Sequence, residues 1–94
     1  MASPAQIAND MDARARFWSN RDKDVAFACR DAAHVIRAYL FGPVPDGRTV
    51  TGVLTRLHRL LDERFQGLGA ADQKKALHRA VDAINALRKE ARAS

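Results

Sequence analysis

A stripe of apolar residues in the second half of the chain limits the possible folds more than any other feature. Between residues 50 and 65, apolar side chains recur every three or four positions, at Val50, Val53, Leu54, Leu57, Leu60, Leu61 and Phe65. This spacing places them on one face of an α-helix and leaves the charged residues on the other. Such a helix is stable only when other elements bury its apolar face, so the pattern predicts a helical core.

The first helix is predicted from its start signal. Residues 3–6, Ser-Pro-Ala-Gln, combine a serine cap, a proline at the first helical position and a glutamine that completes a capping box. We expect this helix to run to about Trp18. Arg14 lies among its apolar positions, where it could stack on Trp18 one turn later or pair with Asp10 one turn earlier.

Further start and stop signals delimit the other helices. Residues 19–24, Ser-Asn-Arg-Asp-Lys-Asp, predict a Ser/Asn cap and a second helix that stops at Phe41-Gly42-Pro43. The prolines and the Asp-Gly pair in residues 42–48 predict a rigid connector. Thr49 or Thr51 is then expected to cap the third helix.

The remaining sequence completes an all-α fold. The Gly-Leu-Gly sequence at 67–69 is expected to end the third helix, and a fourth should run from about 70 to 91. No segment alternates apolar and polar residues as a strand would. We therefore predict a compact four-helix bundle over residues 1–94, with a short N-terminal helix and three longer amphipathic helices in a single domain.

The composition excludes several classes of protein. Apolar residues make up 47 % of the chain and charged residues 29 %, which is typical of a globular domain. No apolar run approaches the roughly 18 residues of a membrane span, and the N-terminus does not resemble a signal peptide. The only cysteine, Cys29, cannot form an internal disulfide, so we expect a reducing, cytoplasmic location.

The sequence lacks the side-chain patterns of an enzyme. Its histidines, His34, His58 and His78, fall on three different predicted helices without a metal-binding motif. Cys29 lies on the predicted core face of the second helix, where a thiol is unreactive. We expect no catalytic residues, no metal, no cofactor and no small-molecule substrate.

The second helix has an apolar stripe on the side opposite its predicted core face. Phe27, His34 and Phe41 recur every seven residues there. Either this side is also buried within the bundle, covered by the first helix, or the two phenylalanines form an interface with another chain. In a symmetric dimer, Arg30 and Arg37 would lie toward the rim, and His34 could make assembly sensitive to pH.

The positive charge of the chain is concentrated in its second half. Residues 1–47 hold six Lys/Arg and six Asp/Glu, whereas residues 48–94 hold ten and five, which gives the net charge of +5. On the third helix we expect Arg59–Glu63 and His58–Asp62 pairs to compensate the charges. The fourth helix carries a predicted basic face, formed by Lys74, Lys75, His78, Arg79, Lys89 and Arg92.

Two functions follow from these surfaces. The first is a small, non-enzymatic interaction, adaptor or regulatory protein that binds a protein partner or itself, as a homodimer, through its helix faces. The alternative is an accessory nucleic-acid-binding protein that contacts the phosphate backbone through the basic face of the C-terminal helix.

Overall fold

The protein folds into four α-helices, which confirms the predicted all-α four-helix bundle. The computed structural model describes residues 2–93, in which no strand occurs. The helices are α1 (Pro4–Trp18), α2 (Lys23–Phe41), α3 (Gly47–Glu63) and α4 (Ala71–Ala93), with a short 3₁₀ turn, η1 (Leu68–Ala70), before α4.

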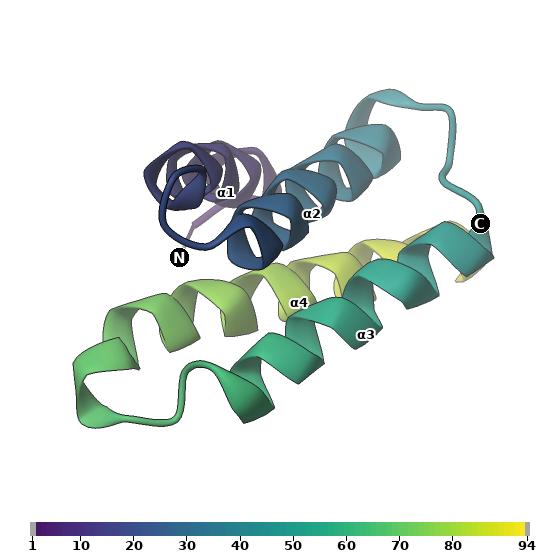
Figure 1. The fold of residues 1–94 in the computed structure, drawn as a ribbon. Coiled ribbons are helices and arrows are strands. Elements are labelled where there is room, and N and C mark those ends of the chain that lie inside the picture. Colours follow the sequence, from purple (N-terminus) through teal and green to yellow (C-terminus); the bar gives the residue numbers. More distant parts are fainter. Residues whose placement is uncertain (1, 94) are drawn as a thin grey trace.

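The helices form two layers (Figure 1). The α1–α2 hairpin packs over the α3–α4 hairpin, and α2 contacts all three other helices, whereas α1 and α3 do not touch. This central position explains the wide buried face of α2, which includes Val25, Cys29, Ile36 and a series of alanines. None of the helices in residues 2–93 is both long and apolar enough to span a bilayer.

Among the predicted N-caps, only that of α1 matches the structure, although the predicted stop of α2 at Phe41-Gly42-Pro43 is confirmed. The Ser3 hydroxyl accepts a hydrogen bond from the Gln6 amide at 3.2 Å, and the Gln6 side chain accepts one from the Ser3 amide at 2.8 Å, as in a capping box. The predicted Ser/Asn cap of α2 is wrong, because Asp22 occupies that position and accepts from the amides of Asp24 and Val25.

The predicted threonine cap of α3 is also wrong. Asp46 has an extended backbone immediately before the helix, and its carboxylate accepts from the Arg48 amide at 3.3 Å. Thr49 donates its hydroxyl proton to the other Asp46 oxygen at 3.4 Å. A carboxylate suits this position because it is attracted to the positive end of the helix dipole.

The end of α3 is set by tertiary contacts. The helix stops at Glu63, before the Gly-Leu-Gly sequence that was expected to end it. Arg64 pairs with Asp22 and Asp24 at the start of α2, and Phe65 is buried with its ring 5.8 Å from that of Trp18. These contacts tie the α3–α4 connection to the α1–α2 connection.

Candidate protein-docking surface

The outer side of α2 carries exposed aromatic and cationic side chains. Phe27 is 58 % exposed and Phe41 is 77 % exposed, with Arg30 and His34 exposed between them. We call these four residues the α2 stripe. The alternative in which the phenylalanines are buried within the chain is therefore wrong, because α1 packs beside this face of α2 and leaves it uncovered.

Ion pairs fix α2 to its neighbours on both sides of the stripe. Arg37 pairs with Asp12 of α1 at 2.5 Å and donates to Asn9 at 2.9 Å. On the other side, Asp31 pairs with Arg56 of α3 at 2.5 Å. Arg37, predicted to lie at the rim of an interface, is thus engaged within the chain, and the stripe is held on a well-anchored helix.

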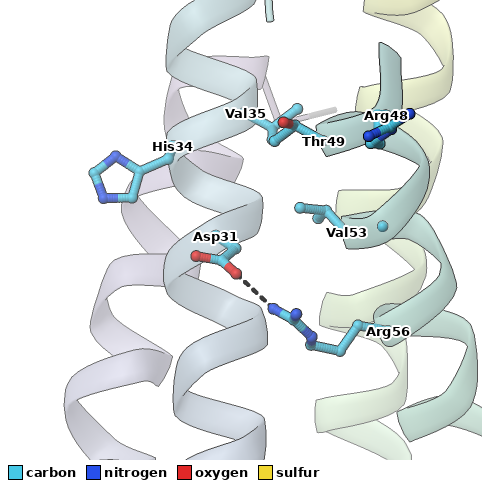
Figure 2. A pocket seen from close by; sticks show the side chains of 8 residues that line it. Asp31, His34, Val35, Arg48, Thr49, Val53 and Arg56 are labelled. Atoms are coloured by element: carbon cyan, nitrogen blue, oxygen red, sulfur yellow. Dashed lines mark hydrogen bonds and ion pairs between the residues drawn. The ribbon is translucent and has the colours of Figure 1, made fainter. Parts of the chain in front are cut away.

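A pocket opens beside the stripe, between α2 and α3 (Figure 2). Its volume is about 310 Å³, and its lining includes Val35 and Asp31 from α2 with Arg48, Gly52 and Arg56 from α3. His34 lies at its edge with the ring directed away from α3. The sequence analysis does not predict this pocket, because the pocket forms only when α2 and α3 pack together. The eight-residue spacing of Arg48 and Arg56, which places both on one side of α3, was the signal available in the sequence.

The third helix does not compensate its own charges as expected. Neither the Arg59–Glu63 pair nor the His58–Asp62 pair forms in residues 2–93. Arg56 pairs across the helix interface with Asp31 instead.

The predicted basic face of α4 divides into three parts. Lys74, Lys75 and His78 together line an open pocket of about 410 Å³ near the start of α4. Lys89 and Arg92 lie at least about 16 Å further along the helix, at 1.5 Å per residue. Arg79 lines a different groove, between α1 and α4. Within residues 2–93 none of these six side chains forms an ion pair, so their charge remains available.

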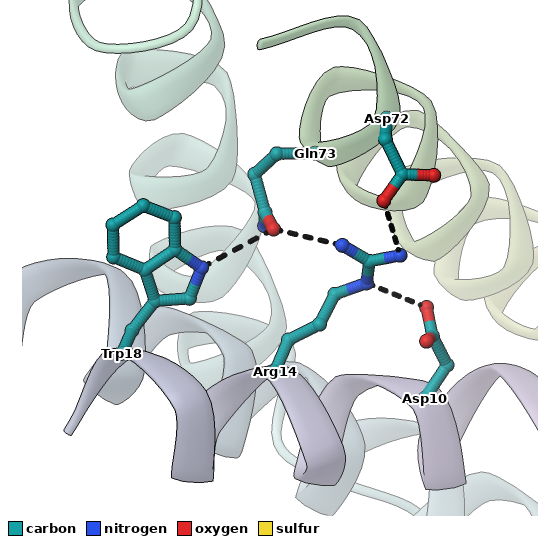
Figure 3. A network of polar contacts seen from close by, with 5 residues as sticks. All are labelled: Asp10, Arg14, Trp18, Asp72 and Gln73. Atoms are coloured by element: carbon teal, nitrogen blue, oxygen red, sulfur yellow. Dashed lines mark hydrogen bonds and ion pairs between the residues drawn. The ribbon is translucent and has the colours of Figure 1, made fainter.

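A partly buried polar network joins α1 to α4 (Figure 3). Arg14 donates from Nε to Asp10 at 2.9 Å, from one terminal nitrogen to Gln73 Oε1 at 2.9 Å, and from the other to Asp72 at 3.1 Å. Trp18 Nε1 donates to the same Gln73 oxygen at 3.2 Å. Of the two expectations for Arg14, the pair with Asp10 is confirmed. Gln73 was missed because nothing in the local pattern marks a buried glutamine.

The network raises the pKa of Arg14. Partial burial lowers this pKa, but the hydrogen bonds and charges of Asp10 and Asp72 outweigh the burial. Gln73 is only 8 % exposed, and two donors converge on its oxygen, which fixes the orientation of its amide. Its Nε2 is buried without a hydrogen bond of regular geometry, although the amide lies close enough to Cys29 to oppose the rise in the thiol pKa.

Cys29 lies in the core as the sequence predicts. The side chain is fully buried, and burial raises the pKa of the thiol to about 11. A thiol of this kind is neither accessible nor ionised at neutral pH, so it is not a nucleophile. Residues 2–93 contain no cluster of three His, Cys, Asp or Glu side chains arranged to hold a metal ion.

Comparison with known proteins adds no family to these observations. No protein-family model, no curated protein and no solved structure matches the chain. The candidate surfaces are therefore defined by geometry and charge, and the α2 stripe is the one that combines exposed aromatic rings with an adjacent pocket.

Proposed function

We propose that this protein is a non-enzymatic interaction module that binds a protein partner through the α2 stripe. The observation that carries the proposal is the exposure of Phe27 and Phe41 on one side of a helix whose other side closes the core. Large aromatic side chains supply much of the binding energy at protein interfaces because they bury a large area at a small cost in side-chain entropy.

The anchoring of α2 supports this proposal. The broad buried face of α2 packs into the core, and the ion pairs of Arg37 and Asp31 add contacts to α1 and α3, so a partner would meet a surface that is already ordered. A preorganised surface loses little conformational entropy on binding. The buried, protonated Cys29 fits the expected cytoplasmic setting and favours binding over thiol chemistry as the function.

Photo-crosslinking in the cells that make the protein tests the docking surface. A photoreactive phenylalanine analogue at position 41 should give a discrete adduct, and the same analogue at position 17 should give none. Phe17 is the control because it is also a large exposed side chain, 52 % exposed, and lies on α1 instead of α2. Adding Phe27→Ser should reduce the adduct at position 41 by about fivefold or more, since interface aromatics contribute strongly to affinity.

The mass of the adduct identifies the kind of partner. A band at twice the chain mass of 10.4 kDa means self-association, and any other mass means a different protein. Because Phe27 is exposed, Phe27→Ser should leave the helical circular dichroism unchanged. Equal adducts at positions 17 and 41, or an adduct that persists with Phe27→Ser, would contradict a docking role for the stripe.

Nucleic-acid binding is the second candidate function, favoured by the unpaired cations of α4. If the protein has this function, it should bind a short mixed-sequence DNA duplex. The affinity should fall steeply between about 50 and 200 mM salt, because counterion release contributes less to binding as the salt concentration rises. Reversing Lys74, Lys75 and Lys89 to Glu should abolish the binding. The matched control reverses exposed cations on the other helices: Arg16, Lys23 and Arg59.

Measuring the mass in solution by light scattering, with and without the duplex, tests whether the protein binds DNA. A mass that does not change with DNA at low salt removes this candidate. If the two triple reversals weaken binding equally, the attraction is a property of the net charge and no specific face is involved.

A further inference from the structure

A notch between two arginines of α3 lies beside the α2 stripe, with His34 of the stripe at its edge. Arg48, Gly52 and Arg56 recur every four residues and so lie along one side of α3, where all three line the pocket against α2 (Figure 2). Gly52 has no side chain, and a Cβ at this position would meet no atom within 4 Å. Val35 and Val53 supply apolar walls. We call this space the Gly52 notch.

Packing does not explain the glycine. Glycine inside a helix destabilises it by about 1 kcal/mol relative to alanine, because more backbone freedom is lost on folding. Gly52 has ordinary helical geometry, and a larger residue would fit there without a clash. What the glycine provides is the open space between Arg48 and Arg56.

The notch can accept a further negative group. Arg56 uses only one terminal nitrogen, Nη1, for Asp31, so the N–H groups on Nε and Nη2 remain available. Arg48 is exposed and takes part in no ion pair within residues 2–93. Guanidinium groups bind carboxylates through paired N–H donors, and the valines suit the methylene groups of a Glu side chain.

A second copy of this chain fits the surface poorly. The acidic residues of α2 are Asp24 and Asp31, and both are already paired, with Arg64 and Arg56. A symmetric dimer through the stripe would therefore bring Arg30 of one copy toward cationic groups of the other without a free carboxylate. Like charges facing each other across an interface oppose association.

We infer that the α2 stripe binds an acidic amphipathic segment of another protein, with one of its carboxylates in the Gly52 notch between Arg48 and Arg56. This inference rests on the proposed docking function and specifies its partner. The apolar side chains of the segment cover Phe27 and Phe41, and its acidic residues face Arg30 and the notch. The arrangement is a helix-on-helix contact with charge complementarity at its edge.

Two synthetic helical peptides test the inference. Both have about 18 residues and the same leucine stripe, and their flanking positions carry Glu in one peptide and Lys in the other. Binding is measured by fluorescence anisotropy at low salt, with backbone amide shifts to locate it. The acidic peptide should bind about tenfold more tightly than the basic one, and salt should reduce the difference.

Two variants show whether the notch takes part. Gly52→Leu fills it, and Arg48→Glu reverses its charge, so each should weaken binding of the acidic peptide by about fivefold or more. Thr51→Leu adds the same side chain at an exposed α3 position that does not line the pocket. Lys89→Glu makes the same change of net charge on α4. Neither control should alter the affinity by more than about twofold.

The outcomes separate this inference from the docking proposal. If both peptides bind alike and Phe27→Ser abolishes binding, the stripe docks proteins but the acidic preference is overturned. If neither peptide shifts the stripe residues, or the control variants act like Gly52→Leu, the notch inference is overturned, and the crosslinking result alone decides the docking role. A crosslinked dimer would mean that the partner is a second copy of this chain, and the inference of an acidic partner would be overturned.

Discussion

Arg14→Met is expected to lower the free energy of unfolding by about 2–3 kcal/mol, through the loss of charge-assisted hydrogen bonds. Most of this loss comes from one contact. Asp10 and Asp72 are 44 % and 87 % exposed, so solvent screens their ion pairs with Arg14. Gln73 is buried, and its Oε1 would keep only the Trp18 donor after the substitution. Urea unfolding followed by far-ultraviolet circular dichroism measures the change.

Arg37→Met is the matched control for this prediction. Arg37 also pairs with an aspartate of α1, but its side chain is 36 % exposed and no buried acceptor depends on it. Its replacement should cost about 1 kcal/mol or less, as is typical of exposed ion pairs. Equal losses for Arg14→Met and Arg37→Met would mean that the buried amide contributes nothing.

A double-mutant cycle isolates the contact with Gln73. Gln73→Leu removes the acceptor, so Arg14→Met should cost about 1–2 kcal/mol less in that background than in the parent protein. Losses that simply add would show that Arg14 stabilises the fold through its carboxylate partners alone.

Local sequence patterns predict the helices and their buried faces. The apolar residues of the third helix from Val50 to Phe65 are all buried, as expected for side chains that recur at helical spacing. The predicted N-caps of α2 and α3 lie two to five residues away from the observed Asp22 and Asp46. Several nearby residues can cap a helix equally well in isolation, and the packing of the connections decides which one does.

The candidate site depends on information that a single helix does not contain. The seven-residue repeat of Phe27, His34 and Phe41 identified the stripe, but its exposure depends on the side of α2 that α1 covers. The short connection between α1 and α2 would allow α1 to pack on either side of α2. The Arg37–Asp12 ion pair shows that α1 packs on the side of Arg37. The Gly52 notch forms only where α2 and α3 pack together, so the sequence of α3 alone does not reveal it.

Long-range partners also explain the errors in charge pairing. An interaction between residues four apart can be predicted from sequence, and the Arg14–Asp10 pair forms at that spacing. Arg56 pairs with an acid 25 residues away in sequence, and Arg64 pairs with two acids that are 40 or more residues away. Once these cross-helix pairs have formed, unpaired cations remain within residues 2–93 on the α2 stripe, beside the Gly52 notch and on α4, as well as at scattered exposed positions such as Arg16 and Arg59.

The protein should lose stability between about pH 9 and pH 11 through the ionisation of Cys29. Burial raises the thiol pKa from 9.0 to about 11 in the folded state. The unfolded chain therefore releases a proton near pH 9 that the folded chain retains until near pH 11. Stability is fully present below pH 9 and is lost as the pH rises toward 11, by about 2–3 kcal/mol in total at 1.36 kcal/mol for each pKa unit.

Cys29→Ala separates this effect from other causes of alkaline destabilisation. At pH 7 the variant should be less stable than the parent protein by about 1 kcal/mol, since it leaves a small cavity in the core. As the pH rises, the parent loses the thiol contribution and the variant does not, so the two stability curves should cross between about pH 9 and pH 11. Urea unfolding under reducing conditions at several pH values measures both curves. Parallel curves would mean that the thiol ionises equally easily in the two states, because water reaches Cys29 or because the Gln73 amide stabilises the thiolate enough to offset its burial.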